Sequence, residues 1–366
     1  MCWCHAGSSV DKLGADAHEA GTVNVSRLPG VGNRLELFDW FRGVAVLAMI
    51  WVHAANTFSH DVLRSERWFA SLDFWHGLVA PAFFWISGFL RGFFVRPGKL
   101  PGRATALRLV GILGLGYALR FPLPSLLQGV WNEAAWRMFF QVDVLQTLAM
   151  SGLLIMGLEH AARAPWQRDF AVFVLMVCAV LCMGPAESWQ TTWLPVDAWL
   201  NRNSGSLFPI FPWIGFGLAG FLCGRLATGS QWKRKITWLA GGGACVAWLA
   251  PEIPWPAGSV GFFLQRLGWV CLFAGLLAWL IPVCQRRAPA IGSLLNFAGR
   301  ESLIIYVVHL QLIHGVPWPG GTLEANFGNS LGIQGVLAWF IALAVASLAL
   351  ARLKGSLLSF KRAVGS

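Results

Sequence analysis

Long apolar stretches alternate with short polar connections along the chain from about residue 38 onward. Ten of them are long enough to cross the roughly 30 Å apolar core of a bilayer as helices that rise about 1.5 Å per residue. They lie at 38–58, 74–95, 104–122, 143–163, 169–186, 207–228, 236–251, 261–284, 291–314 and 331–353. The pattern predicts an all-α fold: a polytopic membrane bundle of about ten transmembrane helices.

The segments outside these stretches are polar. Residues 1–35 are Gly-rich, mixed in charge and without an apolar signal core, so they predict a disordered N-terminal segment rather than a cleaved leader. Residues 36–353 form the predicted membrane domain, and 354–366 form a basic tail. The apolar stretches hold most of the cysteines, which are expected to pack as small hydrophobic residues.

Composition supports a membrane class. Hydrophobic residues make up 56% of the chain and charged residues only 12%, against about 25% charged in a soluble domain. The net charge of +11 could suggest nucleic acid, but outside the apolar stretches no basic run alternates with aromatic residues, which argues against that partner. The expected surroundings are a lipid bilayer, and a homo-oligomer is compatible with the sequence.

Basic residues orient the predicted helices. They concentrate after the second, fourth, sixth and eighth stretches and at the C-terminus, whereas Pro254–Gly261 and Gly315–Ser330 contain no Lys or Arg. Because positive charge collects in cytoplasmic loops, this asymmetry places both termini in the cytoplasm. The expected location is the plasma (inner) membrane.

One apolar stretch carries two ionisable residues, Arg42 and His53. Eleven helical steps return to nearly the same face, and they separate the two residues by roughly 16 Å. Ionisable groups inside a membrane are costly and are therefore candidate functional residues. Arg42 could form a local ion pair with Asp39, or it could bind a phosphate.

The predicted topology brings further polar residues to the outer half of the membrane. We expect a cavity there, lined by His53, His76, Arg120, Asp143, Trp213 and His309, with Gln146 and Tyr306 beside it. A histidine in such a cavity could act as a general base oriented by Asp143, or as a nucleophile that carries the acyl group. Other interpretations stay open: Arg120 and Asp143 could form a structural salt bridge, and His76 and His309 could be packing residues.

A phosphate site at one end of a helix and a base at the other fit a long donor such as coenzyme A. Arg108 and Arg300 lie near the level of Arg42 and could share its phosphate site. We therefore predict an acyl-CoA donor. No metal site is predicted, because the only cluster of suitable ligands is Cys2, Cys4 and His5 in the polar N-terminal segment.

Several segments resemble the transmembrane acyltransferase superfamily. The stretch from Arg34 to Met49, running on to His53, resembles the first helix of the heparan-α-glucosaminide N-acetyltransferase catalytic-domain family, and Arg42 and His53 match the Arg-x10-His motif of acyltransferase-3 proteins. Further similar segments are Gly77–Gly88, Asp143–Gln146, Phe208–Gly215 and Gly299–His309.

The resemblance implies a membrane acyltransferase that takes an acyl group, often acetyl, from cytoplasmic acyl-CoA. The acceptor would be a hydroxyl or amine, often of a sugar or glycoconjugate, on the outer side. The implied catalytic residue is His53. In the glucosaminide branch the active histidine follows the first helix, so His60 and His76 are alternatives.

Two other function classes fit an intramembrane polar pocket. A transporter or flippase would also line a cavity with ionisable residues, although no internal repeat is evident here. A membrane scaffold or sensor without catalysis is the third reading.

Overall fold

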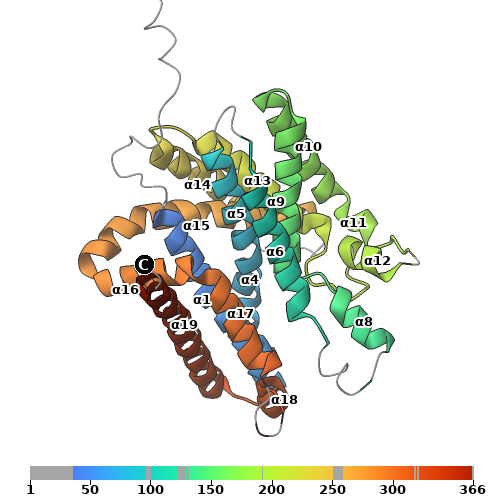
Figure 1. Cartoon of the computed structure of the whole chain (residues 1–366), viewed down its shortest axis with the longest axis vertical. Coiled ribbons are helices and arrows are strands. Elements are labelled where there is room, and N and C mark those ends of the chain that lie inside the picture. Colours follow the sequence, from blue (N-terminus) through green and yellow to red (C-terminus); the bar gives the residue numbers. More distant parts are fainter. Residues whose placement is uncertain are drawn as a thin grey trace, which may run out of the picture.

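The computed structural model describes residues 36–95, 100–122, 129, 132–191, 193–249, 259–316, 319 and 321–364 (Figure 1). The predicted disordered segment 1–35, with the Cys2, Cys4 and His5 cluster, lies outside the described residues.

Helices make up nearly all of the regular structure in the described residues, and an isolated bridge joins Ser59 to Leu331. The helices are α1 (Glu36–Phe58), α2 (Asp61–Ser65), α3 (Arg67–Ala70), α4 (Leu72–His76), α5 (Val79–Phe94), α6 (Arg103–Leu119), α8 (Glu133–Phe140), α9 (Val144–Ala161), α10 (Pro165–Leu181), α11 (Met183–Ala186), α12 (Leu194–Leu200), α13 (Ile210–Ala227), α14 (Trp232–Leu249), α15 (Val260–Arg287), α16 (Pro289–Arg300), α17 (Ser302–Leu310), the π-helical turn η2 (Gln311–Gly315), α18 (Leu323–Phe327) and α19 (Ile333–Val364). The predicted all-α class is confirmed.

The predicted count of ten spans is not supported. Within the described residues, six helical segments are long and apolar enough to cross a membrane, and the bent pair of α16 and α17–η2 would make a seventh. Of the other predicted spans, α6 and α10 reach only 17 residues each, and α14 begins with Lys233, Arg234 and Lys235. The cytoplasmic placement of both termini is not supported either, since six spans leave the termini on one side and seven leave them on opposite sides.

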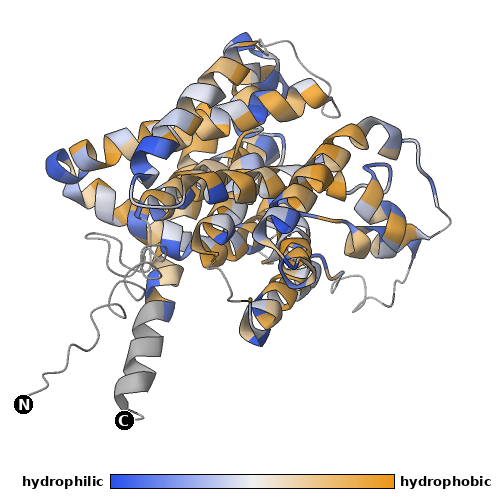
Figure 2. Cartoon of the chain, turned by 90° about the horizontal axis from the view of Figure 1, so that it is seen from above, coloured by the Kyte–Doolittle hydropathy of each residue, from blue (hydrophilic) through white to orange (hydrophobic). Residues whose placement is uncertain are grey.

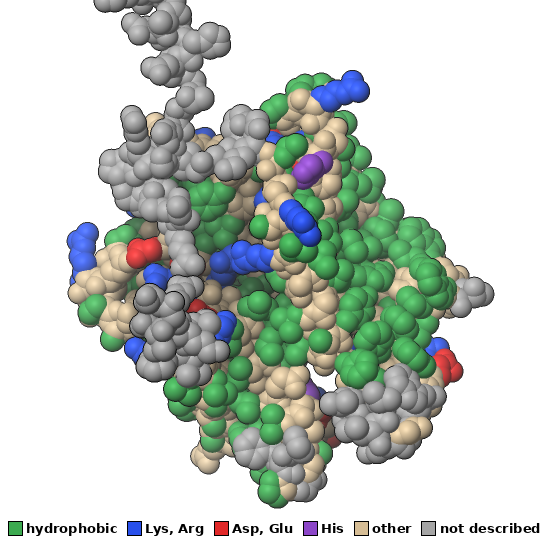
Figure 3. Space-filling view, in the orientation of Figure 1, with side chains coloured by type: hydrophobic (Ala, Val, Ile, Leu, Met, Phe, Trp, Pro, Cys, Tyr) green, Lys and Arg blue, Asp and Glu red, His purple; other side chains and the backbone are tan. Residues whose placement is uncertain are grey.

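The surface matches a membrane setting. Apolar residues cover much of the outward surface of the helices (Figure 2), including large side chains such as Trp238, Trp248 and Trp279 that are more than two-thirds exposed. On the face in Figure 3, most Lys and Arg side chains lie toward the upper end and the left edge. This separation of apolar flanks from charged ends is typical of a multi-pass membrane protein.

The predicted span 291–314 is broken in the structure. α16 and α17 meet at Glu301 and are bent by 76°. The polar pair Arg300 and Glu301 interrupts the apolar run at this point, and α17 then continues into η2. A break of this kind is tolerated at membrane depth only where other protein surrounds it.

α5 and α13 pack backbone against backbone. A Cβ at Gly88 would overlap the carbonyl oxygen of Gly217, and a Cβ at Gly220 would overlap that of Trp85. The two backbones therefore touch without intervening side chains, as small-residue contacts in membranes allow. This contact fixes α5 and α13 as the central layer of the fold.

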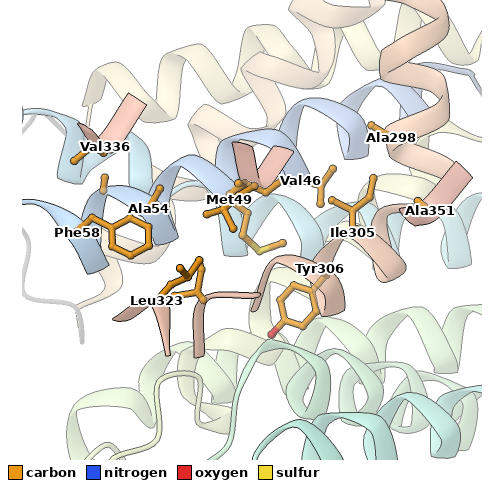
Figure 4. Packing of buried hydrophobic residues seen from close by; sticks show 14 of the residues in the cluster. Val46, Met49, Ala54, Phe58, Ala298, Ile305, Tyr306, Leu323, Val336 and Ala351 are labelled. Atoms are coloured by element: carbon orange, nitrogen blue, oxygen red, sulfur yellow. The ribbon is translucent and has the colours of Figure 1, made fainter. Parts of the chain in front are cut away.

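A second core surrounds α1. It joins residues of α1 to residues of α17, α18 and α19, among them Met49, Phe58, Ile305, Leu323 and Val336 (Figure 4). In the same view Tyr306 directs its hydroxyl away from this core, toward the green part of the chain. α1 is thus held over its whole length, which positions the polar residues that it carries.

The α5–α13 contact predicts different effects for two glycine-to-alanine substitutions. Gly220→Ala should lower the stability by about 2 kcal/mol or more, because the facing backbone has no room for a methyl group. Gly111→Ala in α6 is the matched control: a Cβ there meets nothing within 4 Å, and alanine favours the helix by up to about 1 kcal/mol. Thermal unfolding of both variants in detergent checks this, and equal melting temperatures would contradict the contact.

Candidate functional site

α1 carries both residues that the sequence singled out. The helix runs unbroken from Glu36 to Phe58, so Arg42 and His53 lie on nearly the same face, roughly 16 Å apart. At the arginine end Asp39 meets Arg300 of α16, and at the histidine end His53 meets His309 of α17. The site therefore has two ends, joined by one rigid element.

Asp39 organises the arginine end. Arg42 Nη1 lies 4.0 Å from Asp39 Oδ1, and Arg300 Nε lies 3.7 Å from Asp39 Oδ2. Arg300 reaches this position because α16 touches α1 directly: a Cβ at Gly299 would overlap the Asp39 carbonyl oxygen. The carboxylate is buried, whereas both guanidinium groups keep access to solvent. Two arginines thus share one negative charge at the end of α1.

Arg108, the third predicted member of the arginine group, lies apart. It is exposed on α6, a helix that packs chiefly on α9, and no described ion pair joins it to Asp39. The structure brings Arg42 and Arg300 together at Asp39, whereas no described contact places Arg108 in the same group.

Three histidines meet at the other end. The ring of His53 lies 5.2 Å from that of His309 and 6.4 Å from that of His314, centre to centre. His309 is fully buried, and its Nδ1 lies 2.8 Å from the Ile305 carbonyl oxygen. Because a carbonyl only accepts, Nδ1 donates, and Nε2 is left as an acceptor with no described hydrogen-bond partner. This buried acceptor lies beside His53.

Arg120 and Asp143 form the salt bridge that the sequence left open as one alternative. Arg120 Nη2 donates to Asp143 Oδ2 at 2.6 Å, and its Nη1 donates to Gln141 Oε1 at 2.9 Å. Asp143 also caps α9, where its Oδ1 accepts from Val144 N and the Gln146 side chain completes a capping box. Both Asp143 oxygens therefore have partners, in Arg120 and in the cap of α9, and the orientation of His53 by Asp143 stays a prediction.

The salt bridge nevertheless belongs to the histidine end. Arg120 interacts electrostatically with His53, and both Arg120 and Asp143 interact in the same way with Tyr306. Tyr306 also packs edge-on against His309, with 5.8 Å between ring centres. His53, His309, Tyr306, Arg120 and Asp143 thus form one polar group, which we call the histidine cluster.

His76 and Trp213 are not among the contacts of this cluster. His76 Nε2 accepts from Trp51 Nε1 at 3.0 Å, and Trp51, two residues before His53, projects from a different side of α1. Trp213 packs against Phe208, 4.7 Å between ring centres, inside an aromatic core. The expectation of a single cavity lined by all six residues is wrong, because helical geometry sends these two side chains elsewhere.

The loop alternative His60 has a structural task. The His60 side chain caps α2, where its Nδ1 accepts from Leu63 N at 3.0 Å. The backbone N–H of His60 donates to the Leu331 carbonyl oxygen at 3.0 Å. A ring nitrogen committed to a helix cap leaves only one nitrogen for chemistry. The contacts favour His53 over His60 and His76 as the reactive histidine.

Sequence reasoning missed His314 and Glu324 as members of the site. His314 Nδ1 lies 2.8 Å from Glu324 Oε2, and its ring faces His53. No local pattern marks these two residues, because His314 lies at the end of an apolar stretch and its partner is ten residues further on. Their meeting depends on the η2 turn and on α18.

The arrangement suits proton transfer more than metal binding. Among the described residues, no group of three or more His, Cys, Asp or Glu side chains is placed to hold a metal ion. The histidine cluster instead offers neutral imidazoles beside a paired cation, and the other end of α1 offers guanidinium groups suited to phosphate.

Comparison with known proteins gives the family. A search of curated proteins found no match. The family model described as heparan-alpha-glucosaminide N-acetyltransferase, catalytic, matches residues 34–251, a range that holds Arg42, His53, Arg120 and Asp143 and ends before α16. Since this match spans more than half of the 366 residues, the chain belongs to the heparan-alpha-glucosaminide N-acetyltransferase catalytic-domain family.

Proposed function

We propose that this multi-pass membrane protein transfers an acetyl group from acetyl-CoA to an amine or hydroxyl of a sugar or glycoconjugate, with His53 as the reacting residue. The observation that carries the proposal is the division of α1 into an arginine end and a histidine end, roughly 16 Å apart. The family supports acetyl transfer from acetyl-CoA. We propose the acceptor and the roles of individual residues from the contacts described above.

Arg42 and Arg300 bind the phosphates of the donor in this proposal. Guanidinium groups suit phosphate because their donors form a planar fork. Asp39 holds both in place and leaves them a net positive charge. The donor then lies along α1 with its thioester near His53, which places the arginine end in the cytoplasm and the histidine cluster toward the outer side of the plasma membrane.

His53 removes a proton from the acceptor as the acceptor attacks the thioester. The new C–N or C–O bond forms, the C–S bond breaks, and the CoA thiolate takes up a proton. His309 supports this step through its unprotonated Nε2 beside His53. An acetyl group carried transiently on His53 is the alternative path, and trapping of an acetylated enzyme with acetyl-CoA alone would reveal it.

The acceptor binds beside Arg120, Tyr306 and Gln146 in this proposal. Arg120 interacts with His53 and Tyr306 packs against His309, whereas Gln146 completes the α9 cap beside the Arg120–Asp143 salt bridge. Guanidinium and hydroxyl groups of this kind can bond the hydroxyl groups of a sugar. Trp213 no longer belongs to this set, because it packs inside an aromatic core.

Replacement of His53 tests the base. His53→Gln should lower kcat about 100-fold or more, the usual contribution of a general base, while the protein stays folded. Acetyl transfer from radiolabelled acetyl-CoA to glucosamine, with purified protein in lipid vesicles, measures this. His160→Gln is the matched control, because His160 is exposed at the C-terminal end of α9 and bonds only its own helix. Full activity of His53→Gln would contradict the proposal, and flux of an unmodified solute into the vesicles would favour a transporter.

Replacement of the arginines tests the donor site. Arg42→Ala and Arg300→Ala should each raise the KM for acetyl-CoA about 10-fold or more, with a smaller change in kcat, since a charge-assisted hydrogen bond is worth about 1.5–3 kcal/mol. Arg234→Ala, on the exposed first turn of α14, is the control. An unchanged KM in Arg42→Ala would exclude this arginine from the donor site.

A further inference from the structure

The end of the broken helix pair is shaped to present His314. α17 passes into the π-helical turn η2, in which Val316 N donates to the Gln311 carbonyl oxygen at 2.7 Å. A π-turn holds one residue more than an α-turn and shifts the side chains that follow, and such turns are frequent at functional sites. This turn places His314 near His53, on a different helix.

Glu324 holds His314 from the opposite side. The carboxylate Oε2 lies 2.8 Å from His314 Nδ1, so Nδ1 donates and Nε2 is left able to accept a proton. α18 positions this carboxylate: Thr322 caps the helix by accepting from Ala325 N, and α18 packs on both η2 and α1. The pair is therefore built from two elements, η2 and α18, and α18 is held in place by α1 as well.

Exposure rises along the path from the buried histidine to the pair. His309 is completely buried, whereas the side chains of His314 and Glu324 are 38% and 56% exposed. His53 lies between them, 5.2 Å from His309 and 6.4 Å from His314 between ring centres. The rings of His53 and His314 are therefore near neighbours, and a water between their nitrogen atoms would complete a path for a proton. These side chains therefore form a series that runs from the interior of the protein to its surface.

We propose that His314 and Glu324 form the proton exit of the site: they accept the proton that His53 takes from an ammonium acceptor and release it to water. The inference rests on the proposed function and adds an amine as the substrate class. An ammonium group must lose one proton before it attacks and a second as the amide forms. One of the two ends on the CoA thiol, and the other leaves through His314, so acetylation releases one net proton.

The charges around His53 favour this direction. Arg120, directly after α6, interacts with His53 and repels a positive charge there, and His309 on α17 is fully buried with its Nδ1 bonded to the Ile305 carbonyl oxygen. Glu324 on α18 is the carboxylate that contacts His314, and it stabilises a positive charge on that ring. The Asp143 carboxylate is already paired with Arg120. A proton on His53 is therefore driven toward the His314 side.

The test compares pH profiles with glucosamine as acceptor. His314→Gln and Glu324→Gln should lower kcat about 10-fold or more at pH 7 while the KM for acetyl-CoA stays unchanged. At pH 9 the loss should largely vanish, because an amine with a pKa of about 8 is then already neutral and has no surplus proton to export. Added imidazole should restore part of the activity of His314→Gln at pH 7, as an external carrier of the same proton.

Two exposed groups far from the cluster provide matched controls. Glu133→Gln removes a carboxylate paired with Arg137 on α8, and His160→Gln removes an imidazole on α9. Both should keep the wild-type pH profile.

Three outcomes would overturn the proton exit. These are wild-type activity of His314→Gln at pH 7, a loss that stays constant between pH 7 and pH 9, or a loss that imidazole does not relieve. The last two would show that His314 only supports the fold. Failure of the proposed function differs from all three, because the wild type itself would then transfer no acetyl group at any pH.

Discussion

The site depends on direct backbone contact between α1 and the broken helix pair α16–α17. Gly43 on α1 lies against the Leu295 carbonyl, and Gly299 on α16 lies against the Asp39 carbonyl, with no room for a Cβ at either position. Because the backbones touch, Arg300 falls beside Asp39 and the following helix delivers His309 to His53. A larger residue at either glycine would separate both pairs at once.

The cost of burying charge explains most of the remaining polar contacts. Ionisable groups at membrane depth need partners, and the described structure supplies them between helices that are distant in sequence. Arg91 on α5 forms a bidentate ion pair with the buried Glu159 on α9. Arg168 and Arg225 share Asp169. Arg266 on α15 donates to the Phe74 carbonyl oxygen and lies over the Phe74 ring, which ties the short helices after α1 to the bundle.

The histidine end differs from these structural pairs. Asp39, Asp143 and Glu159 each have a cationic partner, whereas His53 and His309 meet as two imidazoles with no carboxylate described between them. His309 Nε2 is one of several buried polar atoms without a described hydrogen-bond partner, and each such atom needs a physical explanation. The neighbouring break between α16 and α17 and the π-turn η2 lie on the same segment, so the backbone irregularities and the reactive groups coincide.

The sequence determined the all-α membrane class and the helix that carries Arg42 and His53, and it offered a salt bridge between Arg120 and Asp143 as one alternative. These follow from local properties. The length of an apolar run predicts a membrane helix, and helical periodicity decides which residues share a face of it. Opposite charges inside a membrane are expected to pair, because an unpaired charge there is costly. The number of spans was predicted wrongly. Apolar runs such as 104–122 and 236–251 resemble membrane spans in hydropathy, but the helices that they form are too short or too charged to count as candidate spans.

Only the tertiary structure decided which residues of different helices meet. The helix packing directs His76 and Trp213 into contacts away from His53 and leaves Arg108 exposed on α6. It also places His314, paired with Glu324, beside His53. The direction of a side chain depends on how a helix is rotated against its neighbours and where it breaks, here at the 76° bend and the π-turn. Both result from packing between distant segments, which no local pattern in the chain encodes.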